Sequence, residues 1–116
     1  MKKFLLLMSF INILTGCSNS SIEEAKTFGT KEFNSAEWKK ANNTNRSRMI
    51  YSFLKNHDIT SMSPANIYEM LGESTAYYEY DEFPAYLLET NQGKYIIAFP
   101  VDRETKTIRK YILEPE

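Results

Sequence analysis

The spacing of apolar residues changes three times along this 116-residue chain. A mainly apolar run from Phe4 to Leu14 comes first, and a polar, serine-rich stretch from Ser18 to about Lys31 follows it. From Phe33 onwards apolar positions recur at helical spacing, and beyond Gly72 they occur in short β-branched and aromatic runs. The helical spacing after Phe33 is typical of amphipathic helices, and the short runs beyond Gly72 are typical of strands. The chain is therefore expected to form helices first and a sheet second.

The first predicted helix begins at Asn34 or Ser35, either of which is a favoured N-cap, and runs to about Asn56. Its middle, residues 42–45, consists of poor helix formers. The helix is either continuous there or broken, with Thr44 capping a second segment. Its apolar stripe is Trp38, Ala41, Met49, Ile50, Phe53 and Leu54.

A second, shorter helix has clear end signals. Ser63 is a good N-cap, Pro64 occupies the first helical position, and Gly72 is placed to end the helix. Four strands are expected after it, at residues 77–80, 86–90, 95–101 and 107–113. This order predicts an α+β fold, α-α-β-β-β-β, with two helices packed on one face of a three- to four-stranded antiparallel sheet.

The amino-terminal segment has the features of an export signal. A basic start is followed by an eleven-residue apolar run, which as a helix spans only about 17 Å and is too short to cross a bilayer core of about 30 Å. Leu14-Thr15-Gly16-Cys17 comes next and resembles the lipobox of bacterial lipoproteins. This resemblance implies cleavage before Cys17 and acylation of that cysteine. The chain is thus expected to comprise a signal peptide at 1–16, a lipidated flexible tether at 17–32 and one domain at 33–116.

Acylation at Cys17 predicts a membrane anchor, because two or three acyl chains hold a protein to a bilayer stably. Ser18 rather than aspartate follows the cysteine, which in this class favours the outer membrane and a domain that faces the periplasm. The whole chain has a formal charge of −1; without Lys2 and Lys3 it keeps 12 basic and 15 acidic side chains, a formal −3. This balance argues against a nucleic-acid partner and against a polybasic membrane patch.

The segment from Ile59 to Glu73 resembles part of the SmpA/OmlA-type lipoproteins, which include the small lipoprotein of the outer-membrane β-barrel assembly machine. The runs 95–99 and 107–112 resemble that family's last hairpin. The resemblance implies two helices against an antiparallel sheet, a fold shared with β-lactamase inhibitor proteins. Ser61 and Ser74 depart from the family pattern, and no role in barrel assembly is carried over.

Catalytic and metal-binding chemistry is weakly signalled. The one histidine, His57, adjoins Asp58 at a predicted helix end, where an imidazole interacts favourably with the helix dipole. A zinc site needs three or four ligands, so no metal is expected, and no phosphate-binding or cofactor motif is present. We expect no enzyme activity; the alternative is a small hydrolase or ligand-binding domain that uses His57.

The strongest functional signal is aromatic. Tyr77, Tyr78, Tyr80, Phe83 and Tyr86 fall within ten residues and are interleaved with acidic side chains. Tyrosine is favoured in protein contacts, so these residues form either a partner-binding surface or part of the core. The leading hypothesis is a non-enzymatic module that contacts another envelope protein, and an inhibitor or immunity protein against a hydrolase or toxin is the alternative.

Overall fold

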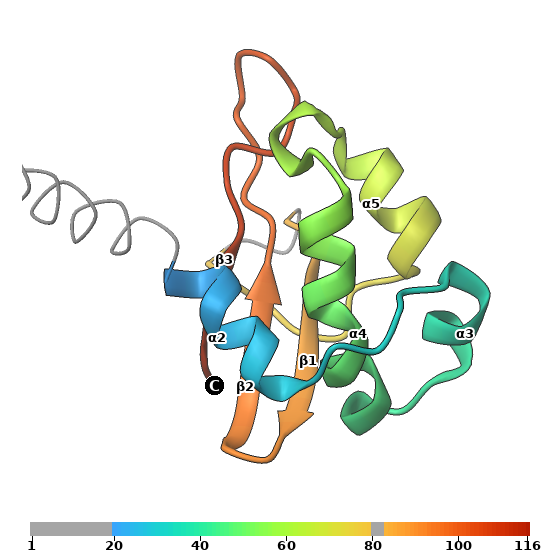
Figure 1. The fold of residues 1–116 in the computed structure, drawn as a ribbon. Coiled ribbons are helices and arrows are strands. Elements are labelled where there is room, and N and C mark those ends of the chain that lie inside the picture. The colour runs from blue at the N-terminus through green and yellow to red at the C-terminus, as the bar shows by residue number, and fades with distance from the viewer. Residues whose placement is uncertain (1–19, 80–82) are drawn as a thin grey trace, which may run out of the picture.

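The computed structural model describes residues 20–79 and 83–116 and confirms the α+β prediction. Four α-helices, one short 3-10 helix and one antiparallel sheet make up this part of the chain (Figure 1). The elements are α2 (Ser20–Phe28), α3 (Ser35–Lys40), α4 (Asn43–Asn56), η1 (Ile59–Ser61), α5 (Pro64–Leu71), β1 (Ala85–Thr90), β2 (Gly93–Ala98) and β3 (Ile112–Pro115).

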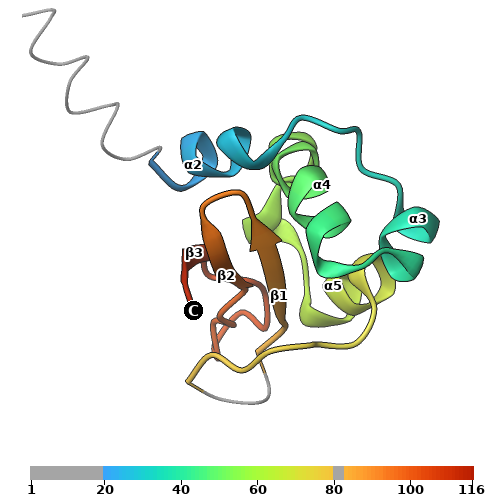
Figure 2. The ribbon, with the colours of Figure 1, turned by 90° about the horizontal axis from the view of Figure 1, so that it is seen from below.

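The sheet has the order β1-β2-β3 and turns one face towards the helices. Tyr86 pairs with Ile97 and Leu88 with Tyr95, so these four side chains lie on the same face and are buried. α4 packs against β1 and α2 against β3 on that face. The chain from Gly72 towards β1 passes over the opposite face (Figure 2). The domain therefore has a helix layer, a sheet and a covering segment.

Two of the four predicted strands, at residues 77–80 and 107–113, do not have the predicted bounds. Residues 77–79 form no strand, and Tyr80 lies outside the described residues. The last strand is confined to 112–115, and before it only an isolated bridge joins Val101 to Ile108. Pro100 supplies no amide proton for a ladder, which explains why regular pairing stops near it.

The long first helix is broken, as the poor helix formers in its middle allowed. α3 and α4 are separate, and Asn42 rather than Thr44 caps α4. The Asn42 side-chain oxygen accepts a hydrogen bond of 2.9 Å from the Asn45 amide. The end signals of α5 are confirmed: Ser63 forms a reciprocal capping box with Asn66.

The flexible tether predicted at residues 17–32 is wrong over its described part, because residues 20–28 form α2. Ala25 is fully buried and Phe28 is 7% exposed, and both belong to the main core. The Tyr95 hydroxyl donates a 2.9 Å hydrogen bond to the Glu24 carboxylate. The folded domain thus begins at α2 rather than at Phe33. The predicted signal peptide and Cys17 lie outside the described residues.

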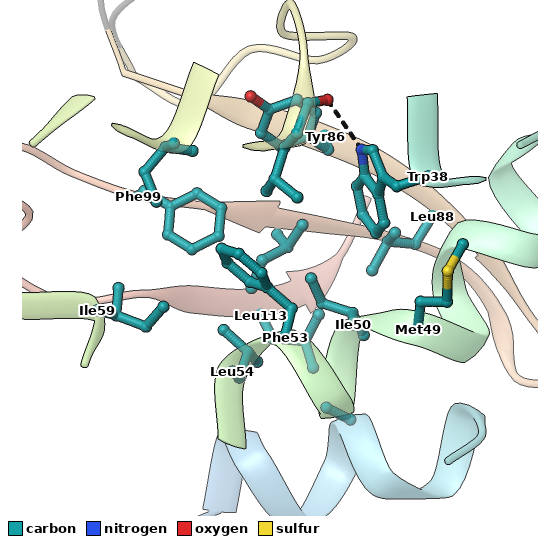
Figure 3. Close-up of a cluster of buried hydrophobic side chains, with 14 of the residues drawn as sticks. Trp38, Met49, Ile50, Phe53, Leu54, Ile59, Tyr86, Leu88, Phe99 and Leu113 are labelled. Atoms are coloured by element: carbon teal, nitrogen blue, oxygen red, sulfur yellow. Dashed lines mark hydrogen bonds between the residues drawn. The ribbon is translucent and has the colours of Figure 1, made fainter. Parts of the chain in front are cut away.

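The core is centred on aromatic rings from α3, α4 and the sheet (Figure 3). Trp38 is fully buried, and its indole donates a 2.9 Å hydrogen bond to the Leu71 carbonyl at the end of α5. Arg46 lies against the same indole, with its guanidinium carbon 5.0 Å from the ring centroid, and its Nε donates to the Trp38 carbonyl. One tryptophan therefore joins three helices.

Candidate functional site

The five aromatic residues predicted to bind a partner have different environments. Tyr86 is fully buried, and its hydroxyl donates a 2.7 Å hydrogen bond to the Gly72 carbonyl. Burial also raises the pKa of Tyr86 well above its ordinary value. Tyr86 is therefore a core residue, and its prediction as a contact residue is wrong. Phe83 is 8% exposed, Tyr80 lies outside the described residues, and Tyr77 and Tyr78 remain accessible.

Tyr77 is the most exposed of these residues. Its side chain is 77% exposed, and among the described residues it is the one large hydrophobic side chain classed as exposed. Tyr78 is half-buried. Burial, followed by the charges of Glu114 and Glu79, raises the pKa of Tyr78, while Arg109 acts in the opposite sense. Tyr78 thus lies in a charged environment between β3 and the neighbouring loop.

Glu79 and Arg109 line a groove, which we call the loop groove. It has a volume of about 420 Å³ and adjoins a smaller, more apolar hollow of about 220 Å³. Phe83, Val101 and Arg103 line both spaces. The further lining residues are Glu79, Asp102, Glu104 and Arg109 in the groove and Pro64 and Lys106 in the hollow.

The wall of the loop groove is held by hydrogen bonds rather than by regular strands. The Asp102 carboxylate accepts from the amides of Glu104 and Thr105, at 2.9 and 3.3 Å. The Ile108 amide donates to the Met62 carbonyl at 2.8 Å, which ties this loop to the start of α5. The lining side chains are therefore presented by a fixed backbone, which lowers the entropy lost when a partner binds.

The groove combines an apolar floor with charges of both signs. Phe83 and Val101 supply the apolar surface, and Arg103, Lys106 and Arg109 stand around it with three acidic side chains. Aromatic residues and arginine are the types most enriched at the centres of protein interfaces. In the described part of the chain, no group of three or more His, Cys, Asp or Glu side chains is arranged to hold a metal ion.

His57 lies at the end of α4, as predicted from the sequence. Its Nδ1 donates a 2.9 Å hydrogen bond to the Phe53 carbonyl, and its ring centroid is 4.7 Å from that of Phe53. The Asp58 carboxylate accepts a 2.7 Å hydrogen bond from the Ser61 hydroxyl. These contacts give both side chains a structural role at a helix end, and the alternative of a hydrolase that uses His57 stays a prediction.

Comparison with protein-family models, with curated proteins and with solved structures found no match to this chain. The similarity to SmpA/OmlA-type lipoproteins therefore stays a prediction from the sequence. Within residues 20–79 and 83–116, no helix is both long enough and apolar enough to cross a membrane.

Most residues of the loop groove carry no recognisable signal in the sequence. Val101 lies at the end of the predicted strand 95–101, Arg103 between the last two predicted strands, and Arg109 within the predicted strand 107–113. Only folding brings them next to Phe83, which is at least 18 positions away in the chain. A single sequence carries no signal for such a long-range contact, whereas the local cluster of tyrosines was visible.

Proposed function

We propose that the mature chain is a lipid-anchored protein-interaction domain of a bacterial cell envelope, held at the outer membrane through Cys17 and facing the periplasm. It acts by contact with another envelope protein rather than by catalysis. The sequence Leu14-Thr15-Gly16-Cys17, placed directly after a short apolar run, supports the anchor. The resemblance of residues 59–73 to SmpA/OmlA-type lipoproteins supports an envelope role.

The observation that carries the contact role is the exposed side chain of Tyr77, two residues before Glu79 of the loop groove. An aromatic residue that is 77% exposed contributes little packing energy to its own domain, but it offers a large, rigid contact area to a partner. Glu79, two residues further on, lines the groove together with Arg109. An exposed aromatic side chain thus lies two residues along the chain from a charged residue of the groove.

Site-specific photocrosslinking in living cells tests the contact role. A photoreactive amino acid replaces Tyr77 in one variant and Arg103 in a second, and Lys40 in the control. Lys40 is exposed on α3, on the far side of the domain from α2. We expect one adduct of the same mass from the probes at positions 77 and 103 and none from the probe at position 40.

A charge reversal at the groove decides whether the adduct depends on this surface. Arg109→Glu, combined with the probe at position 77, should lower the adduct yield at least fivefold. Arg48→Glu makes the same charge change at an exposed position on α4 and should leave the yield unchanged. Equal yields in both variants, or equal adducts from Tyr77 and Lys40, would refute the contact surface.

The anchor is tested separately. The intact protein should carry labelled acyl chains and sediment with membranes, whereas Cys17→Ala should lose the label and become extractable without detergent. A Cys17→Ala protein that is still acylated would contradict the assignment of the anchor.

A further inference from the structure

One of the two edges of the sheet lacks a hydrogen-bonding partner. β2 is the central strand, so β1 and β3 form the edges. The Glu116 amide donates a 3.0 Å hydrogen bond to the Lys94 carbonyl and thereby continues the β2–β3 ladder. Because backbone groups alternate in direction along a strand, every second residue before Glu116 also bonds to β2. The residues between them point their N–H and C=O groups away from the sheet, and we call this row the β3 edge; it comprises Tyr111, Leu113 and Pro115.

The β3 edge is unpaired in the part of the chain that the structure describes. No hydrogen bond of residues 20–79 and 83–116 involves the N–H or C=O group of Tyr111 or Leu113, or the Pro115 carbonyl. Leu113 is also only 7% exposed, so its peptide groups have little access to water. Buried backbone groups are paired in the great majority of cases, because an unpaired one costs about as much as a lost hydrogen bond. The Leu113 backbone groups are therefore expected to find a partner outside this domain.

The opposite edge of the sheet shows that this fold does provide partners for buried edge groups. Ala85, in β1, is fully buried. Its amide donates a 3.0 Å hydrogen bond to Ser74 Oγ, and its carbonyl accepts one of 2.9 Å from the Thr75 amide. The Leu87 amide donates to Thr75 Oγ1 at 2.9 Å. Ala85 and Leu113 are thus both buried edge residues, but only Ala85 has its backbone groups paired.

The side chains along the β3 edge differ between the two faces of the sheet. On the helix side, Leu113 belongs to the core and Tyr111 packs against that core. On the outer side, Glu114 and Glu116 are exposed, and within the described residues neither forms an ion pair. Lys110, at the other end of the edge, is exposed and basic. Residues directly opposite each other in an antiparallel pair share a face. A complementary strand therefore has apolar residues towards the helices, basic residues beside the two glutamates and an acidic residue beside the lysine.

We propose that the β3 edge receives an extended segment of another protein as an additional, antiparallel strand of the sheet. The residues of this segment opposite Leu113 and Tyr111 are apolar, and those opposite Glu114 and Glu116 are basic. In antiparallel pairing, one residue of the segment bonds to both the N–H and the C=O group of Leu113. Backbone hydrogen bonds supply the affinity in this mode of recognition, and the alternating side chains supply the specificity.

This surface is separate from the sites proposed above. None of the residues of the β3 edge lines the loop groove. Strand addition also needs no lipid on Cys17. The proposal therefore goes beyond the contact role of the loop groove, and either one can fail without the other.

Amide hydrogen exchange, measured by NMR on the unlipidated Cys17→Ser chain, tests the proposal residue by residue. The probe is the end-blocked peptide Lys-Val-Lys-Val-Thr-Val-Glu, which places its valines on the helix side and its lysines beside the two glutamates. At millimolar peptide, exchange of the Tyr111 and Leu113 amides should slow at least tenfold. The Glu89 amide points outward from the opposite edge and should change less than twofold.

Every other outcome counts against the proposal. Unchanged exchange at Leu113 overturns it, and equal slowing at Leu113 and Glu89 shows indiscriminate strand pairing instead. Slowing at Leu113 that grows with protein concentration in the absence of peptide assigns the edge to a second copy of this chain and overturns the assignment to another protein. None of these measurements involves the loop groove or the anchor, so a failure here leaves the function proposed above untouched.

Charge variants test the chemistry of the added segment. A peptide with glutamate in place of both lysines keeps the same length and the same valines, and it should slow exchange at Leu113 at least fivefold less. The variant E114K/E116K should reverse the preference between the two peptides. E69K/E73K makes the same change in net charge at exposed positions away from β3 and should leave the preference unchanged. Equal protection by both peptides, or the same shift in both variants, would refute recognition by the two glutamates.

Discussion

Replacing Phe28 by alanine tests whether α2 is docked on the domain or belongs to a flexible tether. Phe28 is 7% exposed, and its ring centroid lies 4.9 Å from that of Tyr95 in the sheet. Substitution of a buried phenylalanine by alanine costs about 3 to 5 kcal/mol in well-packed cores. Because Phe28 lies at the end of a short helix near the edge of the core, we expect a loss of about 3 kcal/mol in the free energy of unfolding.

Urea denaturation of the unlipidated Cys17→Ser chain, followed by Trp38 fluorescence, measures this loss. Trp38 is fully buried in α3, so its emission reports the core rather than α2 itself. With an m value of about 1.5 kcal/mol/M, a loss of about 3 kcal/mol lowers the midpoint by about 2 M. Glu23→Ala, at an exposed position of the same helix, should change the free energy of unfolding by less than about 0.5 kcal/mol.

Limited trypsin digestion provides a local readout of the same segment. Lys26 and Lys31 should be cut slowly in the Cys17→Ser chain and much faster in Phe28→Ala, because proteolysis needs locally unfolded chain. The reasoning is refuted if Phe28→Ala leaves the midpoint within about 0.3 M and Lys26 is cut as fast in the native protein as in urea.

Three further substitutions test the contacts that hold the fold. Tyr86→Phe removes the hydrogen bond to the Gly72 carbonyl and should cost about 1 to 2 kcal/mol in urea denaturation. Since burial raises the folded-state pKa of Tyr86 above the unfolded value of about 10, its contribution is complete below that pH and is lost as the pH rises beyond it. The fall in stability above pH 10 should therefore be shallower in Tyr86→Phe, and an unchanged slope would contradict this. Gly29→Ala should lower the melting temperature by several degrees, because its φ of +146° and the nearby Arg48 Cα disfavour a Cβ, whereas an unchanged melting temperature would argue against this backbone path. Ser63→Ala should cost about 1 kcal/mol through loss of the α5 cap, and Ser63→Asp should retain most of the stability.

Local signals in the sequence predicted the elements whose ends depend on neighbouring residues. The start of α5 is defined by the cap at Ser63 and the fixed φ of Pro64, and its end by Gly72 with a positive φ of 79°. Each of these signals acts within one turn of the helix end. The poor helix formers at residues 42–45 predicted the weak point between α3 and α4. The α+β class followed from the change of apolar spacing after Gly72, which needs no knowledge of long-range contacts.

Tertiary contacts decided the features that local signals left open. Ile22, Ala25 and Phe28 are too few to identify a helix within a polar stretch, and α2 is stabilised by its packing on α4 and β3. The aromatic cluster was visible in the sequence, but burial of Tyr86 and exposure of Tyr77 depend on which segment lies over the sheet.

The sequence by itself thus predicted that helices precede the sheet, where α5 begins and ends, and a candidate lipid attachment at Cys17, because each depends on a few adjacent residues. Only the tertiary structure decided where the folded domain begins and which aromatic rings a partner can reach. It also brought together the residues of the loop groove, since residues distant in the chain become neighbours only when the apolar faces of the helices and the sheet are buried together.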